Sequence, residues 1–228
     1  MILALVAAIA AAPAPAAACP DLITPQAFVC RALRASNSGD PAASAQAFEE
    51  AAGAQNEEAE KARLWAAAGN MWIAANEPGK AAVALDKALT GTGLQAEQRG
   101  EALLDRARAA ESQNDLKTAR SKVIEAARTV SDDPFLWYFS AALAIRENDA
   151  VTAKAAIGRA LTIEPNNPTV LFEAGHVYHF AGELNAARDY WNRASAADPN
   201  GKSGQAARDA LKMLAAPAAV QSGPAPTK

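Results

Sequence analysis

The most constraining feature of the sequence is an internal repeat of 34 residues. The segment that begins at Pro134 aligns without gaps with the segment that begins at Pro168. The same register finds three further copies toward the N-terminus, starting at Gly100, Ala62 and Pro25, so successive starts differ by 34, 34, 38 and 37 residues. Units of this length bury their apolar faces mainly against their neighbours. We therefore expect one elongated domain instead of a single central core.

Small residues recur where two paired helices have to approach each other closely. The twenty-seventh position is alanine in all five copies, and the eighth position is small throughout: Ala32, Gly69, Ala107, Ala141 and Gly175. Larger apolar side chains at the fourth and twenty-fourth positions fill the space between the helices. Trp65, Trp72 and Trp191 fall at packing positions, so we expect them in the core.

The middle of each copy predicts a tight turn. The fifteenth position is always glycine or asparagine: Gly39, Asn76, Asn114, Asn148 and Gly182. Both residue types tolerate the left-handed backbone conformation that ends a helix. An acidic residue follows in every copy, where it can cap the backbone amides of the next helix. Each copy is therefore predicted to fold as a helix, a turn and a second helix.

This pattern resembles the tetratricopeptide repeat family, whose unit has 34 residues, small side chains at positions 8, 20 and 27, and a proline near position 32. Pro165 and Pro199 match that proline, and the first three copies lack it. The resemblance implies an all-α, right-handed α-solenoid. Its predicted parts are five repeats (25–58, 62–95, 100–133, 134–167 and 168–201), a capping helix (202–216) and a disordered tail (217–228).

Composition agrees with a helical chain and excludes several function classes. About a quarter of the residues are alanine, which favours helices, and the scarcity of β-branched and aromatic residues disfavours a sheet. A net charge of −3 without runs of lysine or arginine disfavours nucleic-acid binding. Two cysteines are too few for a cysteine-rich zinc module. The sequence contains none of the common catalytic motifs, so we expect a non-catalytic protein without a cofactor.

The N-terminus predicts export. Residues 1–18 resemble a signal peptide, because an apolar stretch, Ile2–Ala12, is followed by small residues, Ala16–Ala18, that suit signal peptidase. The absence of lysine and arginine before that stretch departs from the usual pattern. The mature chain would begin with the segment 19–24 and lie in the bacterial periplasm or be secreted.

Cys19 directly follows the predicted cleavage point and has three possible fates. It can form a disulfide with Cys30 in an oxidising compartment. Alternatively, Ala16–Cys19 resembles a bacterial lipobox, although alanine stands where leucine is usual, and acylation would make the chain a membrane-tethered subunit of an envelope assembly. Both thiols can also stay unmodified.

The family resemblance implies a concave surface that is lined by the first helix of each repeat. The predicted partner-binding set lies at its groove positions: Arg63, Asn70, Arg108, Phe135, Tyr138, Phe172, His176 and His179. The remaining groove positions hold Gln26, Val29, Leu33, Ser36, Ala66, Ile73, Glu101, Leu104, Glu111, Ala142, Ile145 and Thr169. The ring-rich C-terminal end suits apolar anchors of a peptide or partner helix. Packing of these rings against the next repeat is the alternative. The clamp that binds chaperone C-terminal peptides is not matched, because Ala66 replaces its lysine.

Glu173, His176 and His179 raise a third hypothesis, a metal-dependent enzyme. They follow one another at steps of three residues on one predicted helix. A metal site needs ligands that converge from several directions, whereas one helical stripe spreads them along its axis. We therefore expect no metal at this position, and groove-lining imidazoles instead.

Overall fold

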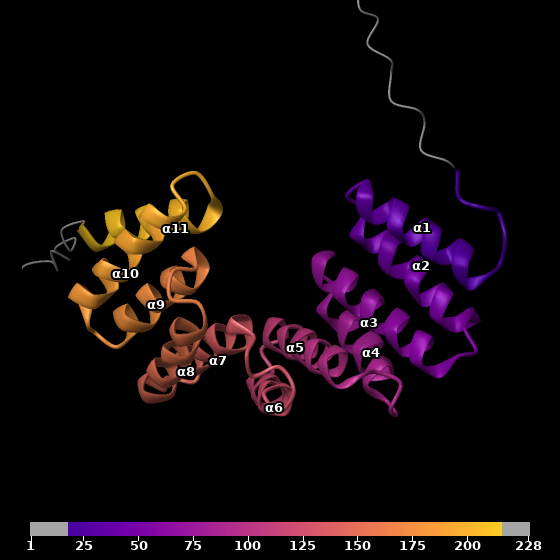
Figure 1. Cartoon of the computed structure of the whole chain (residues 1–228), viewed down its shortest axis with the longest axis horizontal. Helices are drawn as coiled ribbons and strands as arrows, with labels where there is room; N and C mark the ends of the chain where they lie inside the picture. Colours follow the sequence, from indigo (N-terminus) through magenta and orange to yellow (C-terminus); the bar gives the residue numbers. More distant parts are fainter. Residues whose placement is uncertain (1–17, 216–228) are drawn as a thin grey trace, which may run out of the picture.

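The computed structural model describes residues 18–215, and its helices follow one another as five antiparallel pairs and a final single helix (Figure 1). Their bounds are α1 (Pro25–Asn37), α2 (Pro41–Ala54), α3 (Glu58–Ala74), α4 (Pro78–Leu89), α5 (Ala96–Ser112), α6 (Leu116–Ala126), α7 (Pro134–Arg146), α8 (Ala150–Ile163), α9 (Pro168–Phe180), α10 (Leu184–Ala197) and α11 (Lys202–Ala215). This range contains no strand, so the predicted all-α solenoid is confirmed. Nearly all of the predicted signal peptide (1–17), the last residue of the predicted capping helix and the predicted tail lie outside the described residues.

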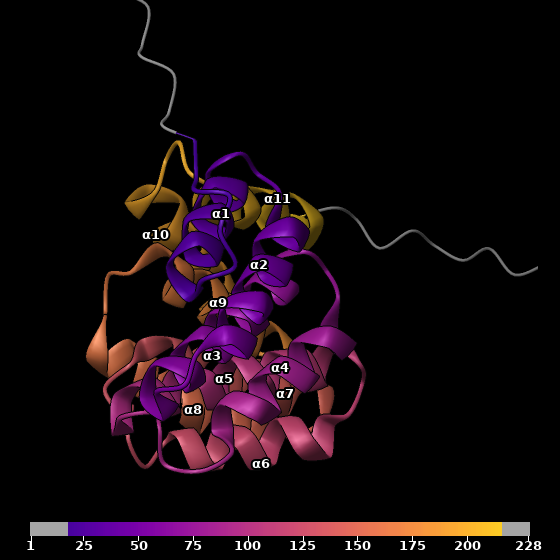
Figure 2. The same ribbon diagram turned by 90° about the vertical axis from the view of Figure 1, so that its right-hand side faces the viewer.

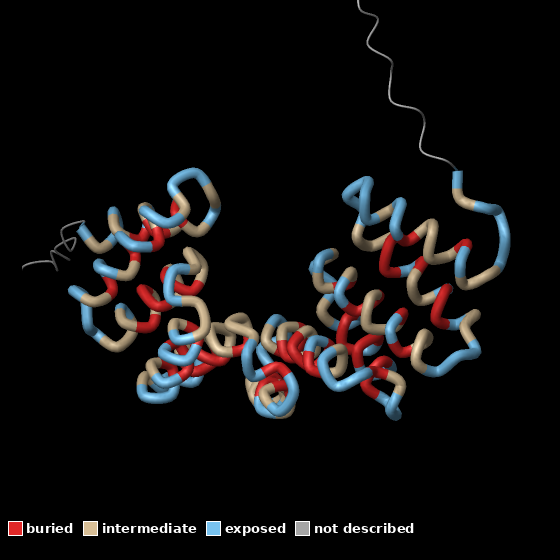
Figure 3. Tube along the Cα trace, viewed as in Figure 1, coloured by how far each residue is buried: buried red, intermediate tan, exposed pale blue. Residues whose placement is uncertain are grey.

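The pairs are stacked into a U (Figure 1). Helices α5 to α8 form its base, α1 to α4 form one arm, and α9 to α11 form the other. The two arms lie one behind the other when the molecule is viewed from the side (Figure 2). Buried residues follow the whole length of the array and gather at no single centre (Figure 3). None of the described helices combines the length and the apolar character that crossing a membrane requires.

The turns inside the pairs form as predicted. All five residues at the fifteenth repeat position have positive φ, between 58° and 78°. Three of the acidic residues that follow cap the second helix through a hydrogen bond from a backbone N–H three residues ahead, at 2.9–3.0 Å: Asp40, Asp115 and Asp149. The capping prediction is wrong for Glu77 and Glu183, which cap no amide. Their carboxylates pair with Lys80 and Lys154 instead.

The two longer repeat spacings come from lengthened helices. Helices α3 and α5 have 17 residues each, whereas α1, α7 and α9 have 13. Helix α3 begins at Glu58, the last residue of the predicted first repeat (25–58). The Glu57 carboxylate accepts hydrogen bonds from the N–H groups of Ala59 and Glu60, at 3.0 and 2.7 Å. These bonds satisfy amides at the start of the added turn and lower the pKa of Glu57.

Alanine dominates the buried apolar residues, and a few large side chains fill the remaining space. Trp72 and Trp191 are buried, as predicted, and their indole N–H groups donate to Glu49 and to the Phe172 carbonyl. Trp65 is only half-buried, contrary to the prediction. The Lys87 ammonium lies over its ring, 3.8 Å from the centroid, so Trp65 sits at the edge of the core.

Two arginines connect the third and fourth repeats at the base of the U. Arg120 of α6 donates to Glu147 at 2.6 Å, next to the end of α7. Arg146 at the end of α7 donates to Asn114 at 2.7 Å, in the turn after α5. This junction is therefore held by charged hydrogen bonds in addition to apolar contacts.

Candidate binding surface

The first helices of the pairs carry the predicted groove residues, and these helices lie along the inner side of the U (Figure 1). Arg63 and Asn70 lie on α3, Arg108 lies on α5, and the ring-bearing residues lie on α7 and α9. The structure divides this set between two places. Arg63 and Asn70 of α3 line a cavity near one arm, whereas Arg108 is not among its lining residues and lies near the Phe135 ring. The rings of α7 and α9 lie further along the solenoid.

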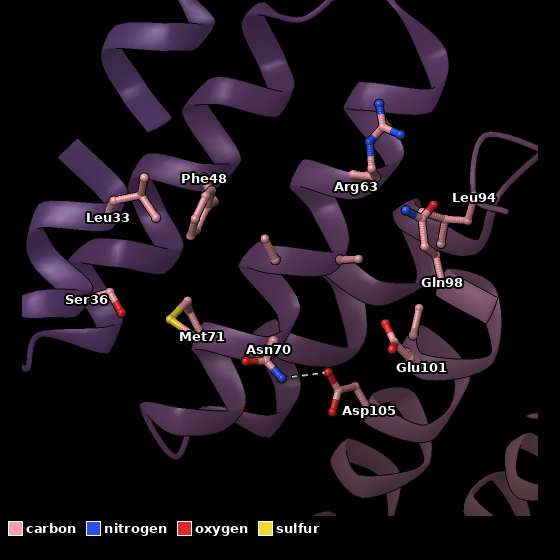
Figure 4. A pocket seen from close by; sticks show the side chains of 13 residues that line it. Leu33, Ser36, Phe48, Arg63, Asn70, Met71, Leu94, Gln98, Glu101 and Asp105 are labelled. Carbon is pink, nitrogen blue, oxygen red and sulfur yellow. Dashed lines mark hydrogen bonds between the residues drawn. The ribbon is translucent and has the colours of Figure 1, made fainter. Parts of the chain in front are cut away.

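A cavity of about 430 Å³ opens between α1, α2, α3 and α5 (Figure 4). We call it the α1–α5 hollow and define it by its lining residues: Leu33, Ser36, Phe48, Arg63, Ala66, Ala67, Asn70, Met71, Leu94, Gln98, Glu101, Ala102 and Asp105. Leu33, Phe48 and Met71 lie on one side, and the charged residues lie on the other (Figure 4). Leu33 remains 53% exposed, so the hollow presents a large apolar side chain to solvent. Such a surface can accept an apolar side chain of a partner.

Hydrogen bonds organise the polar side of the hollow. The Asp105 carboxylate accepts from the Asn70 side chain at 2.8 Å and from Arg108 at 2.9 Å, so it joins two of the predicted groove residues. Arg63 pairs with Glu60 at 2.6 Å on its own helix. Both arginines therefore already have a carboxylate partner.

A second cavity of about 540 Å³ borders the hollow and shares Glu101 with it. We call it the acidic cavity, and its lining residues are Ala96, Glu97, Glu101, Thr129, Val130, Asp132 and Asp133. Four of these residues carry a carboxylate, and none of the lining residues is a lysine or an arginine. The start of α5 thus separates an apolar space from an acidic one.

The predicted rings form two groups, neither of which lines the hollow. On α7, Phe135 meets Tyr138 edge to face at 5.1 Å between ring centroids, and Arg108 lies 5.8 Å from the Phe135 centroid. On α9, Phe172 meets His176 edge to face at 4.5 Å. These contacts hold the rings against neighbours within the protein.

The two histidines of α9 lie beside the buried Trp191, with His176 half-buried and His179 exposed. His176 and His179 lie 5.5 and 5.6 Å from Trp191, measured between ring centroids. Burial lowers the pKa of His176, and the nearby His179 lowers it further. Burial also raises the pKa of Glu173. Within residues 18–215, these three side chains do not converge as a metal-binding group.

The N-terminal segment is fastened to the first helix. A disulfide joins Cys19 to Cys30 of α1, with 5.7 Å between the two Cα atoms. Arg31 donates to the carbonyl of Leu22 at 2.8 Å and adds a second connection. The segment before α1 is therefore held at two points.

Several lining residues of the hollow were not in the predicted set. Phe48 belongs to a second helix, at a position that the repeat pattern assigns to helix packing. Leu94 lies between α4 and α5, and Gln98 lies in the added first turn of α5. The longer spacing before Gly100 was visible in the sequence. Only the structure shows that the added residues line a cavity.

No family model matches the chain, and neither does any curated protein. The fold is similar to that of several solved structures. YrrB, described as a TPR protein with an unusual peptide-binding site, is 16% identical; the match covers 82% of this chain and 91% of YrrB, with a TM-score of 0.59. PilF of Pseudomonas aeruginosa is 14% identical, with 83% of both chains covered and a TM-score of 0.66.

A third similar structure is a tetratricopeptide repeat protein from Parabacteroides merdae. It is 12% identical; the match covers 83% of this chain and 73% of that protein, with a TM-score of 0.67. The TM-scores of 0.59 to 0.67 establish a common fold, and at identities of 12–16% they show the fold alone. Residues 18–215 of this chain therefore have the tetratricopeptide-repeat fold.

Proposed function

We propose that this protein is an exported, non-catalytic adaptor that binds a segment of another protein on its concave surface, with the α1–α5 hollow as the main site. The observation that carries this proposal is the hollow itself. It combines the exposed Leu33 with partly buried Phe48 and Met71, and polar groups border it on one side. An apolar side chain of a partner would displace water from this surface, and polar groups would orient the partner backbone.

Two further observations support parts of the proposal. YrrB, which shares the fold, is described as having a peptide-binding site. The Cys19–Cys30 disulfide suits an oxidising compartment, and residues 1–18 resemble a signal peptide. The same bond disfavours the lipoprotein alternative, because acylation of Cys19 would use the sulfur that the disulfide occupies.

The binding site can be tested with peptides selected from a displayed random library against immobilised residues 19–228. The test variant is Leu33→Asn. Val83→Asn is its matched control, since Val83 lies mid-helix on α4, is 56% exposed and is absent from the hollow. Loss of one apolar contact should weaken binding by about tenfold in Leu33→Asn. Binding by Val83→Asn should equal that of the wild type.

Selection of no peptide, or equal binding by both variants, would contradict the proposal. The double variant Tyr138→Ala/Phe172→Ala belongs in the same experiment, because it tests the predicted contribution of the rings on α7 and α9. Its helicity, measured by circular dichroism, must match that of the wild type. If only this double variant loses binding, the main site lies at the ring-rich end and the assignment to the hollow is wrong.

A further inference from the structure

We infer that the segment bound in the α1–α5 hollow is basic, with a lysine or arginine close to its apolar anchor. This inference rests on the proposed function and adds the chemical class of the partner. It starts from Glu101, the one residue that lines both the hollow and the acidic cavity. A segment that leaves the hollow toward the acidic cavity has to pass this carboxylate.

Glu101 lacks a counter-charge in the described part of the chain. It is exposed, and it forms no ion pair or side-chain hydrogen bond with residues 18–215. Arg63, which lines the hollow together with Glu101, pairs with Glu60. Arg108, about two turns further along α5, pairs with Asp105. Arg99, on the same helix, pairs with Glu125 at 3.6 Å. The negative charge of Glu101 is therefore available to a ligand.

The other carboxylates of the acidic cavity differ in how far nearby backbone groups already stabilise their negative charge. Asp133 accepts a hydrogen bond from the Phe135 N–H at 2.8 Å and caps α7. Glu97 lies in the first turn of α5, where the partial positive charge of the helix end favours it. Asp132 and Glu101 have no such local role among the described residues. These two side chains therefore give a negative charge to the surface that a segment would cross as it leaves the hollow.

Charge complementarity selects the occupant. An acidic segment would meet like charges at Glu97, Glu101 and Asp132, which is unfavourable at close range. A lysine or arginine would add an ion pair at the rim, and the long aliphatic stem of either side chain could follow the apolar wall of the hollow. The pairing should act chiefly on the association rate and on the salt dependence, because the carboxylates are exposed to solvent.

The test uses a peptide selected through Leu33-dependent binding and three synthetic versions of it. Lysine, glutamine or glutamate replaces the residues that flank its apolar anchor. Affinities are measured by fluorescence anisotropy at low and high salt. We expect the lysine version to bind most tightly and the glutamate version least tightly. The preference should shrink as salt is added.

Glu101→Gln is the variant that locates the effect. It should weaken binding of the lysine peptide by about two- to fivefold and leave the affinity for the glutamine peptide unchanged. Glu50→Gln is the matched control, because Glu50 is also an exposed glutamate on a helix but lies outside both cavities. Glu50→Gln should bind all three peptides as the wild type does.

Two negative results have different meanings. Equal affinities for the three peptides, together with unchanged binding by the Glu101→Gln variant, would overturn the inferred preference for a basic segment. The hollow would remain a binding site. Absence of Leu33-dependent binding by any peptide would overturn the proposed function, and the inference with it.

Discussion

At the scale of single residues, the glycines at the eighth repeat position set the distance between paired helices. A Cβ atom added at Gly175 would overlap the indole ring of Trp191, and one added at Gly69 would overlap the side chain of Leu85. The other three copies carry alanine at this position, and Ala32, Ala107 and Ala141 are all fully buried. A side chain larger than alanine therefore does not occur at this position in any copy.

Gly175→Ala should destabilise the protein by about 1–3 kcal/mol, because the buried Trp191 ring has to move. Gly158→Ala is the control, since a Cβ atom there meets nothing within 4 Å and alanine is the better helix former. That control should stabilise the protein by about 0.5–1 kcal/mol. Urea unfolding followed by circular dichroism measures both changes. A Gly175→Ala variant as stable as wild type would show that this contact does not limit the helix spacing.

Residue-scale predictions succeeded where one repeated position has one physical role. Positive φ at the fifteenth position and burial at the eighth could be read from five aligned copies. Trp65 was harder to predict, because the same repeat position can face the core or its edge. At the fourth position Leu103 and Leu171 are buried, whereas Trp65 is half-buried beneath Lys87. Which of the two occurs depends on the neighbouring helix, and the repeat pattern of one sequence does not contain that information.

At the scale of elements, the added first turns of α3 and α5 are the main departure from a uniform repeat. The sequence revealed extra residues at both places but not their conformation. The Glu57 cap starts the added turn of α3, and a hydrogen bond from the Gln95 N–H to the Gln98 side chain, at 3.2 Å, lies at the start of that of α5. Such caps depend on single side chains and are visible in a sequence only when the helix start is already known.

The link between the N-terminal segment and α1 leads to a second prediction. Reduction of the Cys19–Cys30 disulfide should remove about 2–3 kcal/mol of stabilisation, because the bond closes a short loop. The effect should be confined to one arm, since each repeat contacts mainly its neighbours. Hydrogen exchange measured by mass spectrometry should become faster in α1 and stay unchanged in α9 and α10. Faster exchange along the whole array would contradict this locality.

At the scale of the whole molecule, the solenoid could be predicted from the repeat, but the position of the cavity could not. The predicted groove set emphasised rings on α7 and α9, whereas the hollow lies between α1, α2, α3 and α5. A cavity arises where side chains of several helices fail to fill the space between them. That failure depends on the angles between repeats, which the sequence of each repeat does not specify.

The base of the U provides the third prediction. Arg120→Ala/Arg146→Ala removes the charged contacts between the third and fourth repeats. Small-angle X-ray scattering should then give a larger radius of gyration and a broader distribution of distances. The Arg120 and Glu147 side chains are only 21% and 29% exposed, and Arg120 also donates to the hydroxyl of the buried Ser140, so the free energy of unfolding should fall as well.

Arg106→Ala is the control for this shape change. Arg106 pairs with Asp86 at 2.8 Å where α4 of one arm meets α5 of the base, and among the described residues this is the one ion pair that joins the second and third repeats. Its scattering curve should match that of the wild type. Identical curves for the double variant and the wild type would show that apolar packing alone fixes the shape.

The prevalence of alanine among the buried residues has a calorimetric consequence. A methyl group buries little apolar surface, and newly exposed apolar surface is what raises the heat capacity on unfolding. An array of this kind should therefore have a heat-capacity change below the usual value of about 12–15 cal/mol/K per residue. A smaller heat-capacity change flattens the dependence of stability on temperature. The protein should thus keep nearly constant stability over a wide range of temperatures, and cold denaturation should lie far below freezing.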